Sequence, residues 1–441
     1  MNHAPAKPAT PPRLIVPDLA RGLALAGIAM ANAVQSWVIN GYDAAGEPGW
    51  TLGGVRPGVA ADAVAAVFSA MFVHVRGLPM FSTLLGFGIG LISANLYRRG
   101  YPPRPARRVL ARRYGILALF GLAHMFLLFH GDIMFYYGLI GVVVSLLFTL
   151  RSKWLRVIAY VVLLGHAAFT TMNAVGLYFL AQPQDFYDLP FTASLVTYPA
   201  YLEANADSGL AMLTNAPFAV IQLGGLVILG YVWAREGYLV NVSGHRRVLW
   251  AWVAVGTVVA VGIGVPWSLS ATGVLSPQLE QTMFVANLGW GLFTGPAILA
   301  GLALATNGVQ QRMYARAAAT GDATAPGWAY PFVALGKRSM SGYLAQTFVF
   351  LALVMPFGLG VGLGASASEK LLIGFGVWLT TLALAVVCEH FDIPGPFEQL
   401  HRRLSYGPTK RLEPYTPGRK RRSLGAWQKT PIQKTPRAER A

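Results

Sequence analysis

Two histidines and a carboxylate lie within nine residues of one another, beside otherwise apolar sequence. His124, His130 and Asp132 flank a glycine, Gly131. A carboxylate next to an imidazole orients the ring and raises its basicity, as a general base requires. We expect His124 or His130 to act as a base, with Asp132 close enough to His130 across the glycine turn to assist it. The competing interpretation is structural: His124 is a hydrogen-bonded interhelical histidine, and the other two cap a helix at the water interface.

A second set of polar residues lies within the first apolar segment, which is long enough to cross a bilayer. Asp18 and Arg21 are three residues apart and can pair on a helix surface. Arg21 and Asn32 are eleven apart, so they share a helix face and lie roughly 16 Å apart along the axis. Gln35 continues the polar pattern. Such groups in a membrane helix usually face a protein interior or a water-filled cavity, although amides and small residues also mediate helix packing.

Further candidate ligands for a substrate lie elsewhere in apolar sequence. Tyr343 and Gln346 share a helix face and can hold a hydroxyl or a carbonyl, and Tyr136 follows the histidine turn. Packing contacts explain these side chains equally well. The sequence has a single cysteine, Cys388, and lacks His-Glu-x-x-His, paired-cysteine and phosphate-loop motifs, so we expect no metal site.

The composition is that of an integral membrane protein. Of the 441 residues, 54% are hydrophobic and only 12% are charged, against roughly 25% charged residues in soluble domains. We predict an all-α polytopic fold of about ten transmembrane helices. The apolar runs are 17–39, 63–97, 109–129, 132–150, 155–179, 210–234, 248–270, 284–308, 339–363 and 370–388.

The second run is too long for one span, and it holds charged and helix-breaking residues in its middle. These residues are His74, Arg76, Gly77 and Pro79. Proline removes a backbone donor and loosens a helix. We therefore expect a break there, with the true span starting at Met80.

Basic residues predict the orientation. The segment 98–113 holds seven arginines, and the alternate loops near 40–62, 180–209 and 271–283 are acidic. By the positive-inside rule both termini are cytoplasmic, in a cell (inner) membrane. We predict a cytosolic leader at 1–13, a membrane domain at 14–407 and a basic tail at 408–441.

The basic, proline-rich tail from Glu389 onward is expected to be a disordered arm held near anionic lipid. Nucleic-acid binding is the competing explanation of its charge. We reject it, because a position beside the membrane already accounts for the basic residues.

Five short motifs in order resemble the YeiB-like family of multi-pass bacterial membrane proteins, domain of unknown function 418. They are PDLARG at 17–22 with Asn32, FSTLLGFG at 81–88, His124 with GDI at 131–133, GKRS at 336–339 with Tyr343 and Gln346, and GPFE at 395–398 with Arg402, Arg403, Tyr406 and Gly407. The resemblance covers about residues 13–407.

That family is distantly similar to transmembrane acyltransferases, which move an acyl group from a cytosolic coenzyme A thioester to a sugar or lipid. The resemblance implies a transmembrane-acyltransferase-like bundle. Arg21 followed by Asn32 matches the glucosaminide N-acetyltransferases, but Asp43 stands where those enzymes have a catalytic histidine. The base must then come from elsewhere, or the chemistry has been lost.

We therefore expect an acyl-coenzyme A donor and a small-molecule, glycan or lipid acceptor. Arg21 with Arg108, Arg112 and Arg113 would hold the donor's phosphates, and Asn32 would stabilise the oxyanion. Asp18, Gln35, Tyr136, Tyr343 and Gln346 would contact the substrate. The alternative is a non-enzymatic transporter, flippase or lipid- or metabolite-binding protein, and a structural subunit of a larger complex is a third reading. The sequence leaves the oligomeric state open.

Overall fold

The computed structural model describes residues 13–180 and 189–415, and within these ranges it consists of helices and loops without strands. Eight helical segments are long and apolar enough to cross a membrane, and two shorter apolar helices accompany them. Each of the ten predicted runs corresponds to one of these segments, so the chain is a polytopic helical membrane protein. The principal helices are α1 (Ile15–Asn32), α2 (Ala60–Phe68), α3 (Gly77–Arg98), α4 (Pro103–Leu127), α5 (Met134–Leu147), α6 (Ser152–Leu180), α7 (Tyr198–Thr214), α8 (Ala216–Glu236), α9 (Arg246–Ala271), α10 (Gln278–Trp290), α11 (Thr294–Thr320), α12 (Tyr330–Lys337), α13 (Ser339–Leu353), α14 (Ala367–His390) and α15 (Pro396–Tyr406).

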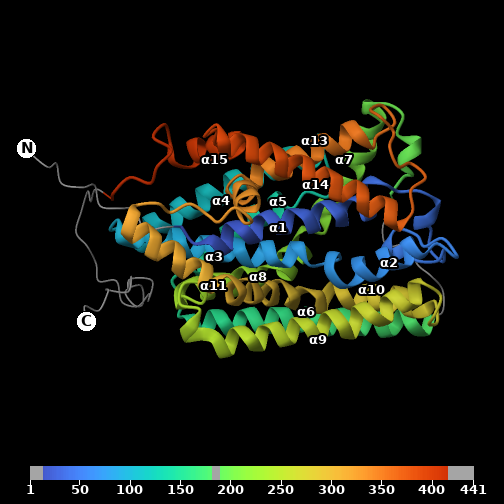
Figure 1. The fold of residues 1–441 in the computed structure, drawn as a ribbon, viewed down its shortest axis with the longest axis horizontal. Helices are drawn as coiled ribbons and strands as arrows, with labels where there is room; N and C mark the ends of the chain where they lie inside the picture. The colour runs from blue at the N-terminus through green and yellow to red at the C-terminus, as the bar shows by residue number, and fades with distance from the viewer. Residues whose placement is uncertain (1–12, 181–188, 416–441) are drawn as a thin grey trace, which may run out of the picture.

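The helices run side by side along the long axis of the molecule, with α1 in the middle (Figure 1). Helix α1 packs against α3, α12 and α14, and α3 packs against α8. Helices α6 and α9 form one outer edge of the bundle (Figure 1). We call the end that holds the turn between α3 and α4 the basic end, and the opposite end, which holds residues 40–59, the acidic end.

Glycines allow the closest helix crossings. A Cβ built on Gly86 of α3 would lie 1.8 Å from the carbonyl oxygen of Val227, and one on Gly230 of α8 would lie 1.9 Å from that of Thr83. Neither helix can therefore carry a larger side chain at this crossing, as is common where helices meet in membranes.

The predicted break in the second apolar run is confirmed. Helix α2 ends in a short π-helical turn, η4 (Ser69–Val73), and α3 begins at Gly77. Between them Val75 has a φ of 54°, which a β-branched residue rarely adopts. The guanidinium of Arg76 donates to the carbonyl oxygens of Ala70 and Met71, at 2.9 Å each. These are carbonyls that a helix end leaves without partners inside the helix.

Helix α5 of the α4–α5 hairpin is shorter than the membrane is thick. Helix α5 has 14 residues, or about 21 Å, against a hydrocarbon core of about 30 Å. Its tip was expected at the water interface, but α7 covers it. Asn205 of α7 donates to the carbonyl oxygens of Met125 and Phe126, at 2.8 and 3.1 Å, and the Tyr201 hydroxyl donates to that of Leu128 at 2.6 Å. The outer loop predicted at 180–209 therefore contains most of a helix that caps the end of α4.

Two basic segments differ from expectation. The arginine-rich turn predicted at 98–113 is helical from Pro103, so Arg108, Arg112 and Arg113 lie on the first turns of α4. The arm predicted to be disordered from Glu389 is ordered through α15, which packs against α4 and α13. Phe397, His401 and Ser405 recur at helical spacing on one face of α15, and His401 and Ser405 are buried. The leader at 1–12 and the tail at 416–441 lie outside the described residues.

Candidate functional site

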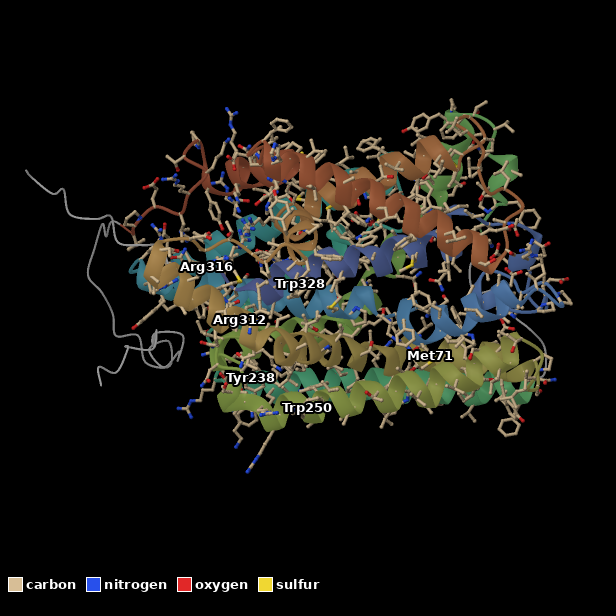
Figure 2. All side chains as sticks on the ribbon, viewed as in Figure 1. Met71, Tyr238, Trp250, Arg312, Arg316 and Trp328 are labelled. Atoms are coloured by element: carbon tan, nitrogen blue, oxygen red, sulfur yellow. The ribbon has the colours of Figure 1, made fainter. Side chains whose placement is uncertain are left out.

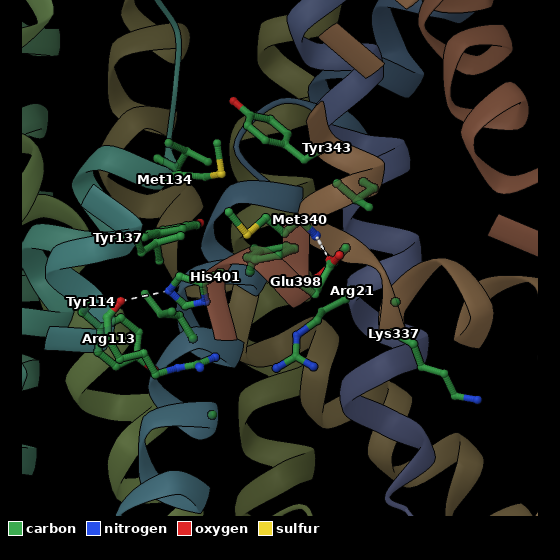
Figure 3. Close-up of a pocket in the computed structure, with 18 of the residues that line it drawn as sticks. Arg21, Arg113, Tyr114, Met134, Tyr137, Lys337, Met340, Tyr343, Glu398 and His401 are labelled. Carbon is green, nitrogen blue, oxygen red and sulfur yellow. Dashed lines mark hydrogen bonds between the residues drawn. The ribbon is translucent and has the colours of Figure 1, made fainter. Parts of the chain in front are cut away.

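A cavity of about 350 Å³ opens among α1, α3, α4, α5, α13 and α15. Its two ends differ in chemistry. Tyr343 and Met134 lie at one end, and Arg21, Arg113 and Lys337 lie toward the other (Figure 3). Between them the walls are largely apolar. These walls are formed by Leu25, Ile28, Phe81, Leu85, Leu91, Ile92, Leu117, Ile133 and Met340. The cavity suits a molecule with an anionic head and a less polar extension.

Five cationic side chains line this cavity: Arg13, Arg21, Arg113, Lys337 and Arg402. Some are neutralised within the protein. Buried Asp18 pairs with Arg13 at 2.7 Å and with Arg21 at 3.2 Å, and Lys337 pairs with Glu389. Among the described residues, Arg113 and Arg402 have no carboxylate partner. A net positive charge therefore faces the cavity, which favours phosphate or carboxylate ligands.

Helical periodicity places Arg21 on the face of α1 that lines the cavity. Arg21, Leu25 and Ile28 lie on one stripe of the helix and all line the cavity. By the same spacing Asn32 continues the stripe, but the cavity ends before it, and neither Asn32 nor Gln35 is among its lining residues. Both are half-buried near the point where α1 passes into the π-helical turn η1 (Ala33–Trp37).

Helix α15 contributes three lining residues that sequence reasoning did not assign to the site: Glu398, His401 and Arg402. The Glu398 carboxylate accepts the backbone N–H groups of Met340 and Ser341, at 2.7 and 3.1 Å. It thereby caps the first turn of α13, whose N–H groups have no partner within the helix. The motif GPFE at 395–398 contained this signal, but its proximity to a basic tail obscured it.

His401 fastens α15 to α4. Its Nε2 lies 2.9 Å from the carbonyl oxygen of Arg113, to which it donates (Figure 3). Burial, together with the charge of Arg113 nearby, lowers the pKa of His401 to about 4. The imidazole is therefore neutral at pH 7, and the Arg113 segment and α15 meet without an additional charge between them.

His124 lies in a chain of three buried side chains from three segments. Its Nδ1 is 2.7 Å from Oδ2 of Asp132, and its Nε2 is 2.9 Å from the hydroxyl of Thr347 on α13. Oδ1 of Asp132 accepts the backbone N–H of Phe135 at 2.7 Å. Asp132 therefore pairs with His124, and not with His130 as its position across the glycine turn suggested. Thr347 had not been predicted, because a threonine one turn after Tyr343 carries no signal of its own.

Tyr343 connects the cavity to this chain of side chains. It lines the cavity, and its ring centroid lies 5.4 Å from that of His124. Since Thr347 follows it by four residues, the two share a face of α13. A hydroxyl, an imidazole and a carboxylate that are linked by consecutive hydrogen bonds can transfer a proton, as in pairs of a nucleophile and a general base.

His130 faces a different space from His124. It lines a cavity of about 30 Å³ with Tyr201 and Asn205 of α7, which is room for about one water molecule. Phe129 separates the two histidines, with ring centroids 6.3 Å from His124 and 5.2 Å from His130. Phe129 and Phe350 both stack on Trp37, at 4.7 and 5.0 Å. We call Trp37, Phe129 and Phe350 the aromatic layer. It lies between the His124 side and the His130 side.

The remaining predicted residues lie away from the cavity or contribute to its walls indirectly. Arg108 is exposed. Arg112 donates to the carbonyl oxygen of Leu404 at 2.7 Å. The Tyr136 hydroxyl donates to that of Met212, at 2.9 Å, and Gln346 donates to that of Leu25, at 3.2 Å. Arg113, Arg21 and Tyr343 are thus the predicted ligands that the fold brings together around one cavity, with Asp18 behind Arg21.

Asp43 is an ion-pair partner of Lys370. Nζ of buried Lys370 lies 2.7 and 2.6 Å from its two carboxylate oxygens. Burial raises the pKa of Asp43, and Lys370 partly offsets this. Asn40 adds a second link, because its amide donates to the carbonyl oxygen of Ala365 at 2.9 Å. This segment therefore fixes residues 40–43 to the start of α14.

Comparison with known proteins gives the family. Residues 233–408 match the family model described as "Protein of unknown function (DUF418)". The uncharacterized protein YeiB of Escherichia coli (strain K12) is 24% identical over 424 residues, covering 89% of this chain and 96% of that protein. The predicted resemblance to the YeiB-like DUF418 family is confirmed. The uncharacterized protein YxaH of Bacillus subtilis (strain 168) is 26% identical over 285 residues, 58% of this chain and 67% of the relative.

The matched region of this YeiB-like protein supplies one wall of the cavity. Residues 233–408 include the lining residues Tyr343 of α13 and Glu398, His401 and Arg402 of α15, and also Thr347, which lies behind the cavity wall. Arg21 and His124 lie before it in the sequence. The DUF418 relatives are named as uncharacterized, so the likeness gives a fold family and no activity.

Proposed function

We propose that this YeiB-like protein is a membrane acyltransferase that takes an acyl group from acyl-coenzyme A. The observation that carries the proposal is one cavity with cations at one end and a hydrogen-bonded hydroxyl, imidazole and carboxylate just behind the other. The acceptor class is a sugar, lipid or small molecule with a hydroxyl or an amine. The proposal also rests on the resemblance to transmembrane acyltransferases.

The cavity fits the donor in charge and in polarity. Arg21, Arg113 and Arg402 would contact the phosphates, since guanidinium groups bind phosphate oxygens with paired, charge-assisted hydrogen bonds. The less polar arm that ends in the thioester would extend along Leu25 and Phe81 toward Tyr343. This direction brings the acyl carbon to the side of the cavity that adjoins His124.

The side chains around His124 suit proton removal from an acceptor. With Nδ1–H donated to Asp132, Nε2 of a neutral His124 is an acceptor for the Thr347 hydroxyl. An acceptor hydroxyl that reaches Thr347 would pass its proton through that hydroxyl to Nε2 as its oxygen bonds to the acyl carbon, and Asp132 would stabilise the resulting imidazolium. The C–S bond of the thioester would break, and the departing coenzyme A sulfur would take the proton back from Nε2. Tyr343 is the polar lining residue placed to donate to the developing oxyanion, a role that Asn32 does not fill because it lies beyond the cavity.

The same proposal fixes the orientation. The basic end carries the arginines of α4 and the cationic part of the cavity. We therefore assign it to the cytoplasmic side of the inner membrane of a bacterial cell. Acyl-coenzyme A is a cytosolic molecule, and its phosphates would then meet the cavity from the side on which it occurs.

Two measurements on the purified protein test the proposal. Coenzyme A and acetyl-coenzyme A should raise the midpoint of thermal unfolding, because a ligand that prefers the folded state stabilises it. Membranes that contain the protein should transfer a radiolabelled acetyl group to an acceptor fraction, and membranes without it should not. Absence of both effects at millimolar ligand would overturn the proposal.

One observation favours a second candidate, a protein that binds an anionic amphiphile without chemistry. Both ring nitrogens of His124 are engaged inside the protein, and His124 itself is not among the cavity-lining residues. In that case thermal stabilisation by coenzyme A or an anionic lipid would occur, but transfer would not.

A further inference from the structure

Arg76 is a buried cation whose charge is not neutralised by a neighbouring carboxylate. Its exposed fraction is 3%. Besides the carbonyl oxygens of Ala70 and Met71, it donates to the Val75 carbonyl at 3.1 Å and to the Asn287 side-chain oxygen at 2.9 Å. All four acceptors are neutral, and within residues 13–180 and 189–415 no ion pair includes Arg76. Isolated charges in membrane proteins are costly and commonly mark a function.

The guanidinium keeps one N–H for a ligand. Arginine has five N–H donors, and the four bonds above use one on Nε, two on Nη1 and one on Nη2. The second N–H of Nη2 has no protein acceptor among the described residues. A bound anion would supply both that acceptor and the missing negative charge.

Arg76 lies in the half of the bundle toward the acidic end, and α2 and the end of α9 extend beyond it. Helix α3 has 22 residues between Arg76 and the turn after Arg98, which is about 33 Å. This equals the thickness of the hydrocarbon core, about 30 Å, to within one residue or two. The leaflet at the acidic end is therefore the one whose lipid phosphates lie nearer to Arg76.

A groove of about 280 Å³ runs from Arg76 along the surface between α9 and α11. Met71, labelled in Figure 2, marks its end near Arg76. Its walls are apolar or small. They comprise Met71, Phe72, Val253, Gly256, Thr257, Ala260, Thr294, Ala297, Ile298 and Gly301. From Ala260 to Val253 the groove follows α9 toward the basic end for about 10 Å.

The groove faces the surroundings of the bundle and not its core. Phe72 beside it is 60% exposed, and Val258, next to Thr257 on α9, is 71% exposed. Exposed apolar side chains on a membrane-spanning helix are in contact with lipid tails, so the occupant of the groove comes from the bilayer.

We propose that this groove binds one anionic phospholipid, with its phosphate at Arg76 and an acyl chain between α9 and α11. Charge complementarity selects an anionic headgroup, because Arg76 is the uncompensated charge at the head of the groove. The apolar walls select a lipid over a free phosphate, which would gain nothing from them. This site is separate from the cavity around Arg21 and does not depend on the proposed acyl transfer.

Native mass spectrometry of the detergent-purified full chain tests the site. Phosphatidylglycerol should remain bound where phosphatidylcholine dissociates. Thr257→Phe fills the groove from an exposed position and should reduce phosphatidylglycerol retention at least tenfold. Val258→Phe adds the same ring at the neighbouring lipid-facing position, and should retain the lipid as the wild type does.

Three results would overturn the assignment. These are equal retention of the two lipids by the wild type, unchanged retention by Thr257→Phe, and equal thermal protection by inorganic phosphate and by phosphatidylglycerol. Arg76→Gln should also lose the preference for phosphatidylglycerol. Because Arg76 stabilises the helix break, Thr257→Phe remains the deciding variant if Arg76→Gln does not fold.

Discussion

Nδ1 of His124 lies 2.7 Å from Oδ2 of Asp132, and both side chains are buried where α4 meets the loop before α5. The pair joins two segments eight residues apart, and Thr347 extends it to α13. This arrangement holds the imidazole in one orientation. It also stabilises the packing of a hairpin that ends inside the bundle, so a test of catalysis must be separated from a test of folding.

Replacement of His124 by Gln should reduce acetyl transfer in membranes by about 10² to 10⁴-fold, the range for loss of a general base. Asp132→Asn should reduce it as well, because the amide no longer stabilises an imidazolium. Tyr136→Phe is the matched control: it removes a buried hydrogen bond on the neighbouring helix, away from the cavity, and should transfer normally. A folded His124→Gln protein with full transfer would exclude His124 as the base.

Arg402→Gln should weaken coenzyme A binding about tenfold or more, since a hydrogen bond to a charged group contributes roughly 1.5 to 3 kcal/mol. Arg403 lies beside it on α15 and is exposed, but it does not line the cavity. Arg403→Gln removes the same charge and should bind as the wild type does. Isothermal titration with coenzyme A measures both variants. Equal weakening by the two would indicate a general charge effect in place of a specific contact.

The docking of α15 should weaken as the pH falls from about 6.5 toward 4. The pKa of His401 is about 4 in the folded protein and about 6.5 when exposed. Below pH 6.5 the undocked state therefore binds more protons, and the free energy of docking falls by up to roughly 3 kcal/mol. Above pH 6.5 this contribution is complete and constant.

Limited proteolysis near residues 391–395 as a function of pH measures this undocking. Cleavage should increase between pH 6.5 and 4 in the wild type. His401→Gln cannot be protonated and should show a flat profile over the same interval. An unchanged pH dependence in that variant would assign the effect to another group.

Lys370→Met should destabilise the protein by about 3 to 5 kcal/mol, because it leaves the Asp43 carboxylate without its partner in a largely buried position. Adding Asp43→Asn should recover much of that loss, since no unpaired charge then remains. Thermal unfolding of the three proteins in detergent measures the effect. If the double variant were no more stable than Lys370→Met alone, the ion pair would not be the source of the loss.

The helical membrane fold could be predicted because a local run of apolar residues marks each membrane helix. The ten apolar runs correspond to helical segments, and His74, Arg76 and Pro79 correctly indicated the break before α3. Helix α7 could not be predicted this way. It is moderately polar, and its role depends on Asn205 meeting the carbonyl groups at the end of α4, a contact between residues about 80 positions apart.

The site was predictable where a polar residue interrupts an apolar helix, as with Arg21 and Tyr343. It was not predictable where the partner is distant in sequence. Asp132 was expected beside His130, but the helix end turns its carboxylate back to His124, and Thr347 joins them from 215 residues later. Glu398 and His401 were not predicted as site residues, because the sequence of a short amphipathic helix is as polar and basic as the tail that follows it.

The short α5 hairpin also changes the length of any route across the membrane. Its 14 residues leave about 9 Å of a 30 Å core beyond the tip, and the aromatic layer of Trp37, Phe129 and Phe350 occupies the boundary there. A group that reached His124 from the basic end would already have completed most of the crossing.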